Sequence, residues 1–432
     1  MFITYLKSRI KLWYSRLAIF SILLISLVSI ISIFLFRQDN EEKEIVIKIN
    51  NNSLVGSSKC KSCHTDIYEN FQSTAHKITS MPAREENIMG SFEDGKNNYA
   101  FNYFDGVVMK ELDSGFYQVN FKNREFDKAY RFDMVIGSGT RGQSFLYWNN
   151  KQLFQLPISY YTMADDWSNS PGYSDQAAYF NRSINSQCLG CHSSYVDILS
   201  TNEYHKEEFD KENIVYGINC ERCHGPGGNH VDYFTLNQPT SEENYIINAN
   251  NYTQQQQLDA CAICHSSTNK SFPSALYFQT GNTLIHDTAT TNLMSKVDVH
   301  GNQYGLLIES ACFANSTTMT CTTCHNPHEE QRGNVSMFSE KCMQCHSIEK
   351  NNFCPLSETT DIAILQENCI DCHMPNRESQ ILNVKLDSET DHSPAVIRTH
   401  LIAVYPESPI KISQFFIKEK LEKSGIGFDY FN

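Results

Sequence analysis

The stretch NCERCHGPGGNH, residues 219–230, places Cys220, Cys223 and His224 within five residues of one another. A C-x-x-C-H unit is the attachment signal for c-type haem, in which two thiols bond to the porphyrin edge and the adjacent imidazole ligates iron. The same stretch continues through Gly-Pro-Gly-Gly to a second histidine, His230. The first half therefore predicts a covalent haem site, and the second half raises the question of what His230 binds.

The unit recurs along the chain of 432 residues. Zinc ribbons and iron–sulfur sites also use C-x-x-C pairs, but neither requires a histidine directly after every second cysteine. All the units here have that histidine, so we expect seven covalently bound c-type haems (heme c, with iron). The seven units span residues 60–64, 188–192, 220–224, 261–265, 321–325, 342–346 and 369–373.

These units define the predicted site residues. The thiols expected to bond to haem are Cys60, Cys63, Cys188, Cys191, Cys220, Cys223, Cys261, Cys264, Cys321, Cys324, Cys342, Cys345, Cys369 and Cys372. The imidazoles expected to ligate iron on the proximal side are His64, His192, His224, His265, His325, His346 and His373.

Eight further histidines are candidates for the opposite, distal side of each iron: His76, His205, His230, His286, His300, His328, His392 and His400. A second strong ligand makes an electron-transfer haem, whereas an open position makes a possible substrate site. His328 lies three residues after His325, an extended reach of about 10 Å. That reach is too short to pass round the porphyrin edge, so His328 should ligate a neighbouring haem. The same argument applies to His230, and the spacing predicts closely packed haems.

The remaining distal candidates differ in context. His205 lies 13 residues after His192 and has enough chain to reach a haem face. His286 and His400 lie in polar or terminal contexts that fit surface roles equally well. One or two haems could therefore lack a strong sixth ligand.

Charge and the N-terminus bear on location. The formal net charge is −14, which argues against nucleic acid, whose binding needs a basic face. Residues 17–36 carry no charge and are long enough to cross a bilayer, with Lys and Arg residues before them and acidic residues after. We expect an uncleaved signal anchor, in preference to a cleaved signal peptide, that attaches the protein to a membrane and leaves the bulk of the chain periplasmic or otherwise extracytoplasmic.

Aromatic and β-branched runs split by turn residues, as in NYAFNYFDGVVMKELDSGFYQVNF (98–121), predict an antiparallel sheet. The motif IGSGTRG (136–142) fits a dinucleotide fingerprint, but a strand pattern follows it, so a glycine-rich hairpin connection is favoured.

Helices are expected near 239–265 and 409–423. The predicted segments are a cytoplasmic N-terminus (1–16), the anchor (17–36), a linker (37–57), a first haem segment (58–96), a β-rich subdomain (97–165) and a domain with six haem motifs (166–432).

Two cysteines, Cys312 and Cys354, fall outside all units. A disulfide between them is the favoured interpretation because the compartment permits it. Unpaired buried thiols and a thiolate haem ligand remain the alternatives.

Several stretches, among them CKSCHTDIYENFQSTAHKITSMP, VIGSGTRGQSFLYWNNKQLFQLPISYY, CERCHGPGGNH and CTTCHNPHE, resemble periplasmic multihaem cytochromes of the cytochrome c-554 type. That family belongs to a wider class with pentahaem nitrite reductase and hydroxylamine oxidoreductase. The resemblance covers roughly residues 56–395. It implies stacked haem pairs held by a mainly α and irregular chain, and with the features above it gives the expected fold class: a mainly α and irregular multihaem cytochrome c fold with a small antiparallel β subdomain and an N-terminal transmembrane helix.

The resemblance also implies distal ligands, on the positions that match the motifs of that class: His76, His230, His300, His328 and His392. Pentahaem nitrite reductase has lysine in place of the histidine at its active haem, and no unit here ends in lysine. We therefore expect a membrane-anchored, extracytoplasmic heptahaem cytochrome that transfers electrons between redox partner proteins, a membrane or periplasmic donor and acceptor. The alternative is a multihaem oxidoreductase acting on a small nitrogen or sulfur compound (nitrite, hydroxylamine or tetrathionate) at one open haem.

Overall fold

The computed structural model describes residues 48–406 and 408, apart from 50–51, 205, 237–245, 267–273, 285–297, 387–391 and 407. The chain divides into two compact units, Met1–Ile47 and Lys48–Asn432. The predicted anchor at 17–36 lies outside the described residues, as do His205, His286 and the helix expected near 409–423. Within the described ranges, no helix has the length and apolar character needed to cross a membrane.

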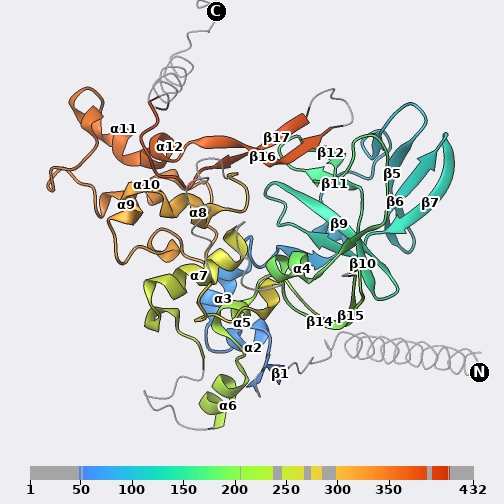
Figure 1. Ribbon diagram of the computed structural model, residues 1–432, viewed down its shortest axis with the longest axis horizontal. Helices are drawn as coiled ribbons and strands as arrows, with labels where there is room; N and C mark the ends of the chain where they lie inside the picture. The colour runs from blue at the N-terminus through green and yellow to red at the C-terminus, as the bar shows by residue number, and fades with distance from the viewer. Residues whose placement is uncertain are drawn as a thin grey trace, which may run out of the picture. The chain divides into compact units, whose positions relative to one another are not determined.

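The haem units lie on short helical turns (Figure 1). The spacing C-x-x-C-H favours such a turn, because residues at i, i+3 and i+4 share one face of a helix. The elements that carry the units are α2 (Ser57–Lys61), α4 (Ser186–His192), α5 (Cys220–His224), α7 (Gln254–His265), η5 (Cys321–Thr323), α10 (Val335–Met343) and α12 (Cys369–His373).

Helix α7 matches the C-terminal part of the helix expected near 239–265. Thr253 and Gln256 form a capping box at its start, which satisfies backbone N–H groups that have no partner within the helix. The other helices are α3 (Thr65–Phe71), α6 (Gly228–Leu236), α8 (Gln303–Ile308), α9 (Ala311–Ala314) and α11 (Ile362–Glu367), with short 3-10 turns η1 (Glu85–Asn87), η2 (Ala249–Asn251), η3 (Ala275–Tyr277) and η6 (Pro355–Glu358).

Two antiparallel sheets form the β-rich region. One has strand order β12-β11-β9-β10-β13, with β8 joining β9 and β3 joining β8; the other has the order β4-β5-β6-β7. Their bounds are β3 (Ser80–Pro82), β4 (Asn98–Ala100), β5 (Gly106–Leu112), β6 (Gly115–Lys122), β7 (Glu125–Arg131), β8 (Met134–Ile136), β9 (Gly142–Asn149), β10 (Gln152–Gln155), β11 (Ile158–Tyr161), β12 (Asp166–Asn169) and β13 (Arg182–Ile184).

Aromatic side chains fill the core of this region. Phe132 stacks on Phe145, with ring centroids 4.4 Å apart, and Trp167 is almost fully buried beside them. The glycine-rich motif at 136–142 joins β8 to β9, which pair antiparallel. The motif therefore lies in a hairpin connection between two antiparallel strands, as the strand pattern after it predicts. Leu189 of α4 packs in a neighbouring cluster with β8, β9 and β10 residues, so one haem unit adjoins the strands.

The predicted mainly α fold class is wrong, and the predicted transmembrane helix finds no support among the described helices. Strands extend well beyond 97–165 and include two hairpins among the haem units. These are β14 (Ser193–Thr201) with β15 (Glu207–Tyr216), and β16 (Asn376–Lys385) with β17 (His392–Arg398); a short pair, β1 (Lys48–Ile49) and β2 (Asn52–Ser53), precedes α2. Each unit needs only one helical turn, so the connecting segments are free to pair as strands.

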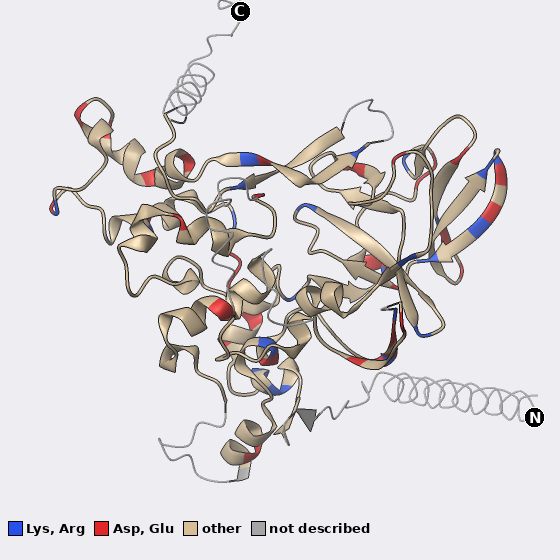
Figure 2. Ribbon diagram, viewed as in Figure 1, with Lys and Arg blue, Asp and Glu red and all other residues tan. Residues whose placement is uncertain are grey.

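Strand β7 forms the edge of the four-stranded sheet and carries both acidic and basic residues (Figure 2). Lys122 Nζ lies 3.7 Å from Asp127 Oδ2, and Arg131 Nε lies 3.6 Å from Asp133 Oδ1. Charged side chains on an edge strand discourage pairing with another chain.

The predicted disulfide is also absent from the described residues, since Cys312 and Cys354 are both free thiols.

Candidate haem sites

Units 60–64, 321–325 and 342–346 present their thiols and imidazole in the same local geometry. The backbone N–H of the histidine donates to the carbonyl of the first cysteine, for example His64 to Cys60 at 2.9 Å, and His325 to Cys321 at 3.0 Å. This bond closes one helical turn, so the two thiols and the imidazole lie on one face. That arrangement suits a porphyrin edge beside the turn and an iron opposite the imidazole.

Oxygen atoms hold several of the unit histidines through Nδ1. A neutral imidazole whose Nδ1–H donates to oxygen leaves the lone pair of Nε2 for a metal and fixes the ring plane. The contacts are His192 with Thr79 Oγ1 (3.0 Å), His224 with the Ile247 carbonyl (2.9 Å), His265 with Gln303 Oε1 (3.2 Å), His346 with the Asn352 carbonyl (3.3 Å) and His373 with the Ala403 carbonyl (2.8 Å).

Histidines from distant segments face unit histidines at a characteristic separation. The ring centroids lie 6.5 Å apart for His64 and His230, 6.0 Å for His224 and His328, 6.1 Å for His325 and His400, and 6.0 Å for His265 and His76. Iron–nitrogen bonds of about 2 Å on opposite faces of a porphyrin would place two imidazole centroids about 6 Å apart. The residues present therefore fit bis-histidine haem sites.

Three of these pairs have nearly parallel rings, with interplanar angles of 15–27°, among the residues described. His265 and His76 are the exception, at 73°. Ligand-plane angle is one of the features that can distinguish one bis-histidine haem from another in a spectrum.

Burial keeps these imidazoles in the form that binds metal. Desolvation lowers the pKa of His76 to about 4, and the neighbouring His265 lowers this pKa further. Burial likewise lowers the pKa of His400 to about 4, with a smaller contribution from His325. A histidine with so low a pKa is neutral at physiological pH, and the neutral imidazole is the ligand form.

Thiols of different units lie side by side. The thiols of Cys60 and Cys220, of Cys191 and Cys264, of Cys261 and Cys321, and of Cys342 and Cys369 are close enough to shift each other's pKa. The thiol of Cys223 lies close enough to Cys261 to raise the pKa of Cys261, and Cys345 likewise raises the pKa of Cys324. In space the units therefore follow the order 60–64, 220–224, 261–265, 321–325, 342–346 and 369–373, and unit 188–192 branches from unit 261–265.

The family model described as "Cytochrome c554 and c-prime" matches residues 160–225, a segment that holds two of the units. Two curated relatives with haem-cytochrome or sulfite reductase names and one solved cytochrome structure extend the similarity over most of the chain. The chain is a multihaem c-type cytochrome resembling the cytochrome c554 family.

The relatives of this cytochrome differ in size and name. It is 21% identical over 387 residues to the dissimilatory sulfite reductase MccA of Wolinella succinogenes, a match covering 79% of this chain and 50% of the relative. It is 26% identical over 166 residues to the C-type polyheme cytochrome OmcC of Geobacter sulfurreducens, covering 34% of this chain and 20% of the relative. The cytochrome thus spans half or less of these relatives.

Its fold resembles that of the outer cell wall cytochrome OcwA. The TM-score is 0.50 at 14% sequence identity, and the match covers 83% of this chain and 82% of that one. This likeness concerns the fold alone.

The cytochrome brings together three of the predicted distal histidines with unit histidines: His76, His230 and His328. His230 and His328 each face the histidine of a different unit, the placement that the reach argument expects. The charge of a protonated His300 would lower the pKa of both His192 and His265, so His300 lies near these two unit histidines. Ligation itself stays a prediction for all four.

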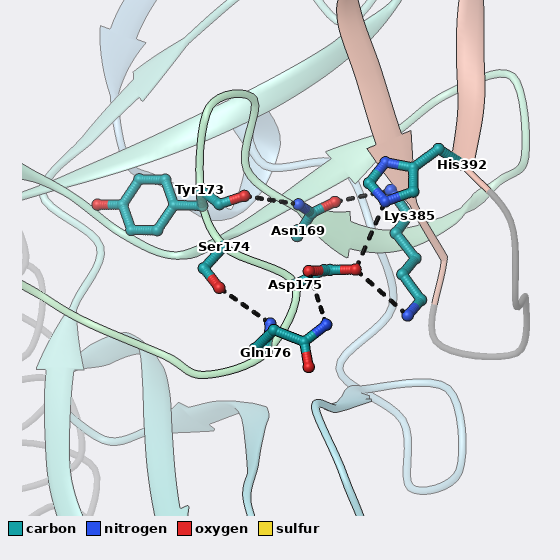
Figure 3. A network of polar contacts seen from close by, with 7 residues as sticks. All are labelled: Asn169, Tyr173, Ser174, Asp175, Gln176, Lys385 and His392. Carbon is teal, nitrogen blue, oxygen red and sulfur yellow. Dashed lines mark hydrogen bonds and ion pairs between the residues drawn. The ribbon is translucent and has the colours of Figure 1, made fainter.

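His392 has a different environment from the other candidates. Its Nε2 lies 3.4 Å from Asp175 Oδ2, which also lies 3.4 Å from Lys385 Nζ (Figure 3). The Lys385 backbone N–H donates to Asn169 Oδ1 at 2.7 Å. These contacts tie the β16–β17 hairpin to the segment after β12, so the structure places His392 in a polar surface network.

His400 is the histidine whose importance the sequence did not indicate. It follows β17 in an irregular segment, and nothing in its local spacing relates it to unit 321–325. Its partner becomes evident only from the fold, because Ser310 Oγ donates to the His400 carbonyl at 3.3 Å and the Ile402 backbone N–H donates back to Ser310 Oγ at 2.8 Å. The buried hydroxyl of Ser310 thereby holds the segment that carries His400.

The two cysteines outside the units each adjoin a unit. Cys312 lies close enough to Cys324 and Cys342 to raise the pKa of both thiols, and Cys354 likewise raises the pKa of Cys372. Burial raises the pKa of the Cys312 thiol. The favoured disulfide fails because each cysteine is placed beside a different haem unit.

Proposed function

We propose that this cytochrome carries seven covalent haems and transfers electrons between redox partners outside the cytoplasm. The observation that carries the proposal is the set of imidazole pairs with centroids 6.0–6.5 Å apart. Iron with two strong histidine ligands exchanges electrons without binding substrate. The c-type haems supply the redox chemistry when bound, and the protein supplies ligands, spacing and exclusion of water.

The proposed ligand sets follow from the pairs. His64 and His230 would hold the haem on Cys60 and Cys63, and His224 and His328 that of unit 220–224. His265 and His76 would hold the haem of unit 261–265, and His325 and His400 that of unit 321–325. Electrons would pass along the spatial order of the units, with unit 188–192 as a branch.

The side chains around the haems orient and tune the ligands. Carbonyl and side-chain oxygens on Nδ1 fix each ring and raise the basicity of the opposite nitrogen. Gln303 performs this role for His265, and Thr79 for His192. Because the acceptors differ from unit to unit, we expect the seven reduction potentials to differ.

A redox titration combined with electron paramagnetic resonance tests this function. We expect several low-spin haems with two imidazole ligands and potentials spread over a wide range. A spectrum dominated by high-spin iron would contradict the electron-transfer proposal, because the paired histidines would then not be ligands.

A second candidate function is reduction of a small oxyanion at one haem, and the similarity to a dissimilatory sulfite reductase over 79% of this chain favours it. Within the described ranges, no histidine ring stacks on His192, His346 or His373. Units 188–192 and 369–373 are the preferred sites, because each lacks a facing histidine among the described residues and adjoins a single neighbouring unit.

Addition of carbon monoxide, sulfite, nitrite or hydroxylamine to the reduced protein tests this second function. A spectral change confined to about one haem, with reoxidation of the others, would support turnover. A fully low-spin spectrum that none of these compounds alters would leave electron transfer as the function.

A further inference from the structure

Glu221, inside unit 220–224, is a buried carboxylate with three backbone N–H partners in two segments of the chain. Only 6% of the residue is exposed. Its Oε1 accepts from the Val55 backbone N–H at 2.9 Å and from the Gly227 backbone N–H at 2.8 Å, and its Oε2 accepts from the Gly56 backbone N–H at 2.8 Å. Hydrogen bonds to an ionised carboxylate are about twice as strong as neutral ones, so these contacts fix the segments that donate them.

Both segments that Glu221 holds lead to ligands of another unit. Gly56 is the N-cap of α2, the helix that carries Cys60 and precedes His64. Gly227 precedes α6, and its carbonyl accepts from the Val231 backbone N–H at 2.9 Å. His230 lies in the first turn of that helix. One carboxylate therefore anchors both the proximal and the distal side of the pair His64 and His230.

The glycines of the Gly-Pro-Gly-Gly segment allow this approach. A Cβ on Gly227 would lie 3.1 Å from Val55 Cγ2, and a Cβ on Gly228 would lie 2.2 Å from Ser53 Oγ. Asn52 completes the contact, since its Nδ2 donates to the Pro226 carbonyl at 2.6 Å and its Oδ1 accepts from the Asn229 backbone N–H at 2.8 Å. The glycines let residues 52–56 pack directly on the segment that ends at His230.

We propose that Glu221 is the positioning residue that sets the axial pair His64 and His230, and hence the sixth ligand of the haem on Cys60 and Cys63. This inference rests on the ligand sets proposed above. A carboxylate supplied by one unit thereby controls the coordination of the neighbouring haem, without touching its iron.

The test uses the haem-loaded, full-length protein with the variants Glu221→Ala, Glu221→Gln and His230→Ala. Electron paramagnetic resonance of the oxidised protein and carbon monoxide binding by the reduced protein count the haems that lack a sixth ligand. We expect Glu221→Ala to remove the sixth ligand from at most one of the seven haems, the same haem that loses its sixth ligand in His230→Ala. The double variant should open no more than His230→Ala alone, because both changes act on the same haem.

Glu221→Gln retains the volume and one oxygen acceptor, but its NH2 group cannot accept from a backbone N–H. We expect a smaller effect, seen as a shifted reduction potential of one haem. This variant also carries the test if Glu221→Ala fails to load all its haems, which the denatured mass reveals.

Glu207 provides a matched control. Its carboxylate accepts from the backbone N–H and the hydroxyl of Ser186, at the start of the helix of unit 188–192, and it has no contact with His230 among the described residues. Glu207→Ala should leave the haem on Cys60 and Cys63 unchanged, so any haem that it opens should add to the one opened by His230→Ala.

The outcomes separate this inference from the proposed function. If His230→Ala opens a haem and Glu221→Ala leaves every haem low-spin with unchanged potentials, Glu221 has no positioning role. A signal from Glu221→Ala that adds to that of His230→Ala also overturns the inference, because a different haem is then affected. If His230→Ala leaves all haems low-spin, the proposed ligand set is wrong and the inference falls with it.

Discussion

At the scale of single residues, the neighbour of each imidazole separates candidate ligands from surface histidines. His230, His328, His76 and His400 face unit histidines at 6.0–6.5 Å, whereas His392 contacts a carboxylate on the surface. The resemblance to known cytochromes implied that His392 is a distal ligand and left the role of His400 undecided. The structure makes His400 the stronger candidate for a distal ligand and His392 the weaker one.

Replacement of His328 tests whether a histidine serves a neighbouring haem. We expect His328→Ala to open the haem of unit 220–224, because the His328 ring lies 6.0 Å from His224. Combining it with His224→Met should still perturb one haem, whereas combining it with His325→Met should perturb two. Spin quantification by electron paramagnetic resonance counts the perturbed haems. Two perturbed haems in the His224 combination would contradict the assignment.

His400 and His392 form a matched pair near the C-terminal end of the described chain. His400→Ala should turn one haem high-spin, because it removes the ring that faces His325. His392→Ala should leave every haem low-spin and change stability by less than about 1 kcal/mol, the usual contribution of an exposed ion pair. Visible spectra of the oxidised variants and denaturant titrations check both. A high-spin haem in His392→Ala would restore its predicted role as a ligand.

At the scale of elements, close contacts between backbones fix where the haem-bearing segments lie. Gly217 follows β15 and has a φ of 67°, and a Cβ there would lie 2.0 Å from the Lys77 carbonyl oxygen. The next residue, Ile218, donates its backbone N–H to the His76 carbonyl at 2.8 Å. The end of a hairpin thus positions the segment of a predicted distal ligand.

Gly217→Ala should therefore displace His76 and destabilise the protein. We expect the free energy of unfolding to fall about 1–3 kcal/mol further than in Gly333→Ala, because overpacking adds to the backbone strain. Gly333 is a suitable control, since its φ of 83° is also in the left-handed region and nothing lies within 4 Å of its Cβ position. Denaturant titration followed by far-ultraviolet circular dichroism measures both. Equal losses would mean that the contact with Lys77 yields freely.

The elements also show what the sequence could reveal. The antiparallel pairing in the β-rich region was predictable, because turn residues separate alternating runs such as those of β5 and β6. The hairpins β14–β15 and β16–β17 were not, because their strands lie among haem units and carry bulges that interrupt the alternation. A resemblance to helical cytochromes then favoured the wrong class.

At the scale of the whole molecule, the number of haems is the central quantity. Seven units predict a denatured mass larger than that of the chain by seven haem increments, retained after acid–organic extraction because thioether bonds survive it. The double variant Cys188→Ser and Cys191→Ser should lose one increment. Mass spectrometry of protein matured by a competent host makes the measurement. Six increments or fewer in the unaltered protein would refute the count.

The site as a whole was predictable only in part. The expected attachment cysteines and proximal histidines follow from a local spacing that any single unit reveals. The distal partners come from distant parts of the chain, and local spacing shows only which haem a histidine cannot reach, as for His328. Their identity depends on tertiary contacts such as those of Ser310 with the segment around His400.

The separation of the paired histidines along the chain bears on how the protein matures. During export, residue 64 emerges long before residue 230, and residue 76 long before residue 265. The first haem attached would therefore wait, with one face uncovered, until much later segments arrive. Each pair of histidine ligands would then close a long loop of the chain, and closing long loops removes much entropy from the unfolded chain. The rate of haem attachment would therefore limit when the protein folds, and without haem these loops would remain open.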